Sequence, residues 1–86
     1  MGTISFDGVR FAVHSDDHHP PHVHAVTPDA VLIFDLLGDG KIRLSSREDA
    51  ITPKNAKRNI QAKIRRVARE NADELMALWE KTHGTR

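Results

Sequence analysis

The fold is decided by residues 22–44, which read HVHAVTPDAVLIFDLLGDGKIRL. Polar and apolar residues alternate over residues 22–25, which is typical of a half-buried β-strand. Residues 30–36 are apolar on both faces until the aspartate and predict a central, buried strand. A Pro-Asp turn separates these two strands, and a Gly-Asp-Gly turn precedes a short edge strand at residues 41–44. The short connections predict that the three strands are antiparallel neighbours.

A β-hairpin is predicted on the N-terminal side of this stretch. Residues 3–6 and 9–15 form its strands, and Asp7-Gly8 is a dipeptide that closes two-residue hairpin turns. Residues 16–21 are expected to be a loop, because two consecutive prolines remove two backbone donors. No helical segment falls between the strands to support a parallel crossover, so we expect an antiparallel meander of four or five strands.

The second half of the sequence changes to a helical period. Thr52 and Pro53 suit the N-cap and the first position of a helix that ends near Glu70. The apolar residues of this segment recur at helical spacing, at Ala56, Ile60, Ile64, Val67 and Ala68. We therefore expect an amphipathic helix that packs on the sheet.

A second helix is predicted after this one. Asn71, followed three residues later by Glu74, resembles a capping box that opens a helix, and Gly84 is suited to end it. The pattern leaves open whether the two helices break or merge at Asn71. Trp79 lies at helical spacing from two leucines, which favours a core position over a binding role.

Length and composition predict one α+β domain over residues 1–86, because 86 residues can build one modest core and not two. Residues 1–45 would form the histidine-rich antiparallel sheet, and residues 52–84 would form a basic helical hairpin or bent helix on one face of it. The chain has no cysteine, which excludes disulfides, thiolate metal sites and cysteine nucleophiles. It also has no leader pattern and no apolar run of membrane-spanning length, so we expect a cytoplasmic protein without a membrane partner.

The charge of the chain is divided between its halves. Residues 1–40 carry one base and six acids, whereas residues 41–86 carry twelve bases and six acids. Between Pro53 and Arg69 there are seven bases and no acid. The positive charge of this segment can be balanced by the acidic half of its own chain, by an acidic partner protein or by nucleic acid. The sequence leaves these three possibilities open. The candidates for nucleic-acid or partner binding are Lys54, Lys57, Arg58, Arg65, Arg66 and Arg69.

Five of the six histidines fall within residues 14–24. His22 and His24 share one face of their predicted strand, and His14 shares a face of the preceding strand with Arg10. If the apolar faces of both strands lie beneath the helices, these side chains gather on the opposite, more open face. The loop would add further polar side chains over one end of that face, namely Asp16, Asp17, His18 and His19.

Three interpretations of this histidine-rich stretch are open. Neutral imidazoles bind zinc, nickel, copper or iron, and a His-X-His pair completed by a loop His or Asp supplies the three protein ligands of a catalytic metal site. Imidazoles can instead act as general acid and base without a metal, with Arg10 stabilising a phosphate, which would suit RNA cleavage or another phosphoryl transfer. In the third interpretation, the histidines are surface strand residues, or they form hydrogen bonds to the Pro-Pro loop and brace it.

Residues 17–25, which read DHHPPHVHA, resemble the signature of a family of small bacterial proteins, the domain of unknown function 4160 family. The first strand and residues 74–80 resemble the two ends of that family. By position, the family histidines correspond to His18, His22 and His24, with Asp17 beside them. Val23 stands where the family usually has an aromatic residue, a difference that concerns packing. The identity of the histidine that completes the cluster with His22 and His24 is left open, because strand geometry favours His14 and the motif favours His18.

The genes of this family often lie beside a gene for a second small protein, and members have been proposed as parts of toxin-antitoxin modules. The resemblance therefore implies a toxin-like effector subunit with a small antitoxin-like partner, whose histidines act on RNA or a nucleotide with or without zinc or nickel. The alternative is a non-catalytic metal-binding or antitoxin-type interaction protein whose basic helix binds an acidic partner or DNA. A homodimer is compatible with the short edge strand. From geometry and motif together, the candidate catalytic residues are His18, His22, His24 and Arg10, and the candidate metal ligands are His14, Asp17, His18, His22 and His24.

Overall fold

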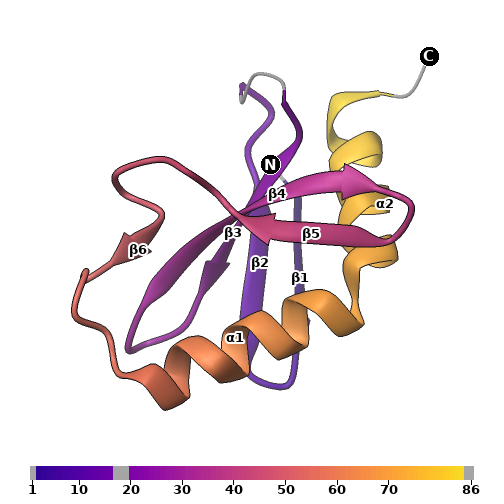
Figure 1. The fold of residues 1–86 in the computed structure, drawn as a ribbon. Coiled ribbons are helices and arrows are strands. Elements are labelled where there is room, and N and C mark those ends of the chain that lie inside the picture. The colour runs from indigo at the N-terminus through magenta and orange to yellow at the C-terminus, as the bar shows by residue number, and fades with distance from the viewer. Residues whose placement is uncertain (1, 17–19, 85–86) are drawn as a thin grey trace.

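An antiparallel sheet is the framework of the fold (Figure 1). The computed structural model describes residues 2–16 and 20–84. These residues form the strands β1 (Gly2–Phe6), β2 (Val9–Val13), β3 (His22–Val26), β4 (Val31–Gly38), β5 (Lys41–Leu44) and β6 (Ile51–Thr52) and the helices α1 (Arg58–Glu70) and α2 (Ala72–His83). The sheet follows the order β1-β2-β3-β4-β5 with antiparallel neighbours, and β6 also pairs with β4. The predicted α+β meander with two C-terminal helices is confirmed.

Tight turns keep the connections of the meander short. Asp7 and Gly8 have positive φ angles of 50° and 82°, as a type I′ hairpin turn requires. Gly38, Asp39 and Gly40, between β4 and β5, also have positive φ angles, of 82°, 54° and 71°. Glycine adopts this backbone conformation without steric cost, and aspartate tolerates it better than most residues. The two turns therefore hold consecutive strands side by side.

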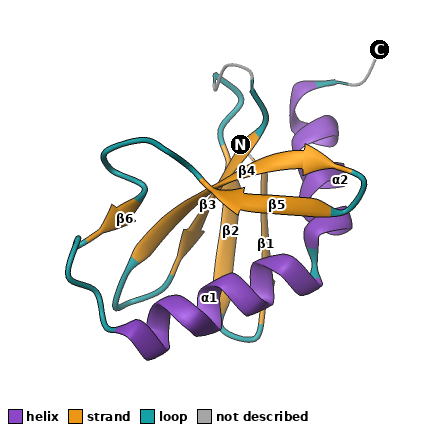
Figure 2. Ribbon diagram, viewed as in Figure 1, coloured by secondary structure: helices purple, strands orange, loops and turns teal. Residues whose placement is uncertain are grey.

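The core lies between one face of the sheet and both helices (Figure 2). On β2, the side chains of Val9, Phe11 and Val13 point to this face and are fully buried. From α2, Leu75 is fully buried and Trp79 is 3% exposed. The prediction that Trp79 belongs to the core is confirmed. Helix α1 contributes the buried side chains of Ile64, Val67 and Ala68.

The opposite face of the sheet is not uniformly open. Ala12 and Ile33 point to this face, yet they are only 6% and 2% exposed. They flank His24, because the strand register pairs Ala12 with His24 and His24 with Ile33. His24 therefore lies in an enclosed row of the sheet rather than on a free surface.

Helix α1 begins at Arg58, later than the sequence pattern predicts. The predicted N-cap, Thr52, instead belongs to β6 and pairs with Val31 of β4. Pairing with a neighbouring strand holds the residue extended and overrides its preference for a helix N-terminus, which was therefore predicted wrongly. The N-cap is Lys57, which makes no side-chain capping hydrogen bond. Lys54 and Lys57 thus precede the helix.

The two helices break at Asn71, the point that the sequence left open. Asn71 has φ −119° and ψ 24°, and its Nδ2 donates a hydrogen bond to the carbonyl of Val67 at 2.8 Å. Since this side chain ends α1 and makes no capping hydrogen bond to α2, the predicted capping box with Glu74 is wrong. Gly84, with φ 73°, follows α2 and confirms its predicted end. Within the part of the chain that the structure describes, no helix is long and apolar enough to cross a membrane.

Candidate active site

Three histidines come together at one end of the sheet: His22 and His24 belong to β3, and His14 directly follows β2. The ring centroid of His24 lies 5.3 Å from that of His14 and 5.6 Å from that of His22. The pairing of Ala12 with His24 explains this grouping, because it places His14, two residues beyond Ala12, on the same face as His22. All three side chains are half-buried. We call His14, His22 and His24 the histidine cluster.

His22 is tied to the loop that precedes its strand. Its Nδ1 lies 3.0 Å from the carbonyl oxygen of Pro20. Since a carbonyl oxygen only accepts hydrogen bonds, Nδ1 carries the proton of this contact, and in the neutral ring Nε2 then carries the lone pair. The contact orients the imidazole for chemistry at Nε2, and it is also the loop-bracing contact that the third interpretation of the sequence expects.

Two residues of α2 extend the histidine cluster toward the core. The indole of Trp79 has its centroid 5.6 Å from the ring of His22 and 3.7 Å from the ring of His83, on which it stacks at 23°. His83 Nδ1 also lies 3.1 Å from the carbonyl oxygen of Trp79. His83 was not among the residues predicted from the sequence. Its position four residues after Trp79, on the same side of a helix, is the signal that could have found it.

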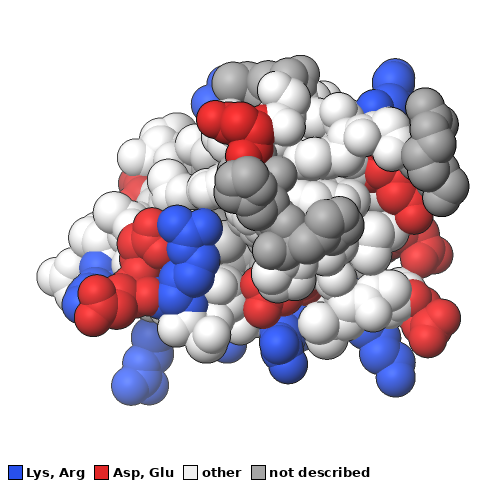
Figure 3. All heavy atoms as spheres, turned by 90° about the horizontal axis from the view of Figure 1, so that it is seen from above, with Lys and Arg blue, Asp and Glu red and all other residues white. Residues whose placement is uncertain are grey.

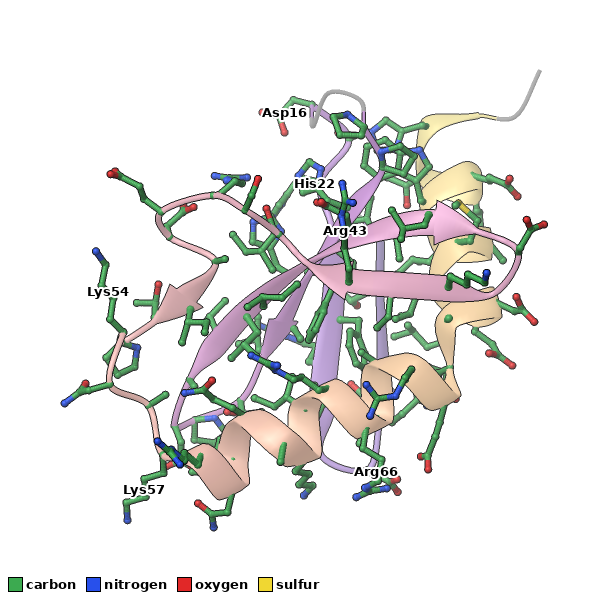
Figure 4. The ribbon with its side chains drawn as sticks, viewed as in Figure 1. Asp16, His22, Arg43, Lys54, Lys57 and Arg66 are labelled. Atoms are coloured by element: carbon green, nitrogen blue, oxygen red, sulfur yellow. The ribbon has the colours of Figure 1, made fainter. Side chains whose placement is uncertain are left out.

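An ion pair lies in the same row of the sheet as His22. The register pairs His22 of β3 with Asp35 of β4, and Asp35 with Arg43 of β5. Arg43 Nε donates a hydrogen bond to Asp35 Oδ2 at 3.3 Å. Figure 4 shows His22 and Arg43 at the same end of the molecule. This arginine was not among the predicted site residues. The signal that could have found it is the Gly-Asp-Gly hairpin turn, because Asp35 and Arg43 lie three residues before and three residues after it.

The other predicted site residues lie elsewhere or outside the described residues. Arg10 pairs with Val26, so Ala12 lies between it and His14 along β2. Asp17 and His18, like the neighbouring His19, are outside the described residues. Within residues 2–16 and 20–84, no group of three or more histidine, aspartate or glutamate side chains is placed to hold a metal ion.

Lys57 and Arg66, two of the bases predicted to bind nucleic acid or a partner, lie away from the histidine cluster. Figure 4 shows Lys57 and Arg66 along the lower side of the molecule, opposite the end that holds His22. In Figure 3, which looks down on that upper end, Lys and Arg side chains lie mostly round the rim. Of the seven bases between Pro53 and Arg69, only Arg66 forms an ion pair among the described residues, with Glu70 on its own helix at 3.3 Å. The acidic sheet thus makes no ion pair with α1 in this part of the chain.

Fold and site together define a small α+β domain that carries a histidine cluster at one end of an antiparallel meander. The chain belongs to the family described as Domain of unknown function (DUF4160), whose model matches residues 8–80. The predicted membership of this family is thereby confirmed. No curated protein and no solved structure matches the chain.

Proposed function

We propose that the protein is the effector subunit of a bacterial two-protein, toxin-antitoxin type module, and that its histidine cluster cleaves RNA by general acid-base catalysis. One observation carries the proposal: the rings of His14 and His22 both lie within 5.6 Å of the ring of His24. RNA cleavage needs two proton-transfer groups a few ångströms apart, and an imidazole populates both protonation states near neutral pH.

The reaction requires one neutral and one protonated imidazole. The neutral ring removes the proton of a ribose 2′-hydroxyl while the 2′-oxygen forms a bond to phosphorus. As the bond from phosphorus to the 5′-oxygen breaks, the protonated ring donates its proton to that oxygen. The products are a 2′,3′-cyclic phosphate and a free 5′-hydroxyl, and the two rings have exchanged protonation states. In this scheme, the contact between His22 Nδ1 and the Pro20 carbonyl directs Nε2 to the substrate.

A metal-assisted form of the proposal uses zinc or nickel held by His22, His24 and a third side chain. The metal would then supply a bound water or polarise the phosphate. Elemental analysis of protein purified without an affinity tag separates the two forms: metal in stoichiometric amount, lost in a variant with both His22→Ala and His24→Ala, selects the metal-assisted one.

The wild-type protein tests the proposal directly. Induced expression of this protein by itself is expected to arrest bacterial growth, and the purified protein is expected to cleave RNA and leave 2′,3′-cyclic phosphate ends. Growth curves and gel analysis of a labelled RNA measure the two effects. Normal growth together with intact RNA would contradict the effector proposal and favour a binding protein.

A second candidate function, a non-catalytic DNA-binding subunit of antitoxin type, is favoured by the arrangement of arginines on α1. Arg58, Arg65 and Arg69 are exposed and follow one another at intervals of seven and four residues. This spacing aligns them in one stripe on the side of α1 away from the buried Ile64 and Val67. A line of guanidinium groups is suited to the regularly spaced phosphates of a DNA backbone.

Reversing the charge of the three arginines in this stripe is expected to weaken DNA binding. The variant with Arg58, Arg65 and Arg69 replaced by glutamate should bind duplex DNA at least about tenfold more weakly, and the slope of log affinity against log salt should become shallower by about 3. Fluorescence anisotropy at several salt concentrations measures both quantities. The matched control replaces Lys41, Arg47 and Lys81 by glutamate, which gives the same net charge. Equal losses in the two variants would indicate a general charge effect and contradict a site on α1.

A further inference from the structure

We infer that His22, Asp35 and Arg43 form a phosphate-binding site, which we call the phosphate row. The row lies across three adjacent strands, because the register pairs His22 with Asp35 and Asp35 with Arg43. The inference rests on the proposed function, since it names the groups that would hold the reacting phosphate of the RNA beside the histidine cluster. Its chemistry can nevertheless be tested without any reaction.

The spacing of the row suits an oxyanion. Adjacent strands lie about 4.8 Å apart, so the Cα atoms of His22 and Arg43 are about 10 Å apart across the sheet. Arg43 leans toward the middle strand, because its Nε contacts Asp35 Oδ2 at 3.3 Å. The guanidinium is thereby drawn toward His22, and Figure 4 shows the two labelled side chains on the same side of the sheet. A phosphate group can lie between them and accept hydrogen bonds from the guanidinium and, when the His22 ring is protonated, from its Nε2.

The exposure of the ion pair shows which side of it faces solvent. The side chain of Asp35 is 16% exposed and that of Arg43 is 68% exposed. The carboxylate therefore anchors the guanidinium from the sheet side, and the outer edge of the guanidinium faces solvent. Among the described residues, Nε makes the one hydrogen bond of this side chain, which leaves the Nη1 and Nη2 groups to donate. Paired donors on a planar guanidinium match the oxygens of a phosphate.

Arg47 provides a comparison, because its guanidinium is already bound by a carboxylate. Its Nε and Nη2 both donate to Asp49, at 3.0 Å and 3.1 Å, so the carboxylate occupies the fork of the guanidinium. The side chain is also well exposed, at 51%, and lies in a loop. Arg47 is therefore a matched control for Arg43, because both are exposed, ion-paired arginines. Of the two, only Arg43 has both Nη groups without a hydrogen bond to the carboxylate, and only Arg43 lies in the row of His22.

The test is a titration of the full-length protein with inorganic phosphate at constant ionic strength, followed by NMR of ¹⁵N-labelled protein. Phosphate is expected to shift the signals of His22, Asp35 and Arg43 with an affinity in the millimolar range. Arg43→Gln is expected to weaken binding at least tenfold, and Arg43→Lys, which keeps the charge but loses the fork, should give an intermediate value. Arg47→Gln should leave the affinity unchanged.

Two outcomes would overturn the inference: phosphate-induced shifts confined to α1 or to the loop around Arg47, or equal weakening by Arg43→Gln and Arg47→Gln. Arg43→Lys keeps the test decisive if the Gln variant folds poorly. Failure of the proposed function is recognised separately. Phosphate binding at the row in a protein that leaves RNA intact would support the phosphate row and contradict the proposed RNA cleavage. RNA cleavage without phosphate binding at the row would support the proposed function and contradict the phosphate row.

Discussion

Replacement of His22 by alanine is expected to lower RNA cleavage by about 10²- to 10⁴-fold, the usual contribution of a positioned acid or base, while the protein stays folded. His22 is half-buried, so its truncation opens no large cavity in the core. The same loss is expected for His24→Ala, because the ring of His24 lies close to those of both His14 and His22. Cleavage rates of purified variants, with circular dichroism to confirm folding, measure the effect.

A second substitution separates chemistry from loop bracing. In His22→Asn, the side-chain amide can still donate a hydrogen bond to the Pro20 carbonyl, but it cannot take up a proton from RNA. If His22 acts as acid or base, the Asn variant is as inactive as the Ala variant. If the contact with Pro20 at 3.0 Å is what matters, the Asn variant recovers activity and the acid-base role of His22 is refuted.

Phe11→Ala is expected to lower the free energy of unfolding by about 3–5 kcal/mol, the usual cost of truncating a fully buried phenylalanine. Phe11 is 0% exposed and stands in β2, directly beneath the helices that complete the core. A domain of this size has a total stability of about 4–13 kcal/mol, so the loss is a large part of the whole. Urea unfolding followed by the fluorescence of Trp79, the single tryptophan, gives the value.

Phe6 provides the matched control for this prediction. It contacts Phe11, with ring centroids 6.3 Å apart, but it is only half-buried, on edge strand β1. Since burial sets the cost of truncation, Phe6→Ala is expected to lose about half as much stability or less. Equal losses for the two variants, or a loss below about 1 kcal/mol for Phe11→Ala, would show that the core does not depend on β2 as described.

The elements that the sequence predicted correctly depend on local signals. Asp7-Gly8 adopts the positive φ angles of a two-residue turn, and the strands on either side pair as the alternation of β2 predicts. Apolar spacing located most of α1, and Gly84 located the end of α2. The alternation of His22, Val23 and His24 likewise assigned both imidazoles to one face of β3. Each of these features is determined within a few residues of chain.

Only the tertiary structure decided which distant residues meet. The register of β2 against β3 brought His14 to His24, and the row across β3, β4 and β5 brought Arg43 to His22. The docking of α2 added His83 through Trp79, and the pairing of β6 with β4 moved the start of α1. Strand register and helix docking are set by the packing of many side chains that are remote in sequence. A shift of the register by one residue would move every side chain of a strand to the opposite face of the sheet. The sequence therefore determined the five strands of the meander, their turns and their faces, whereas β6 and the composition of the site depended on how distant segments packed together.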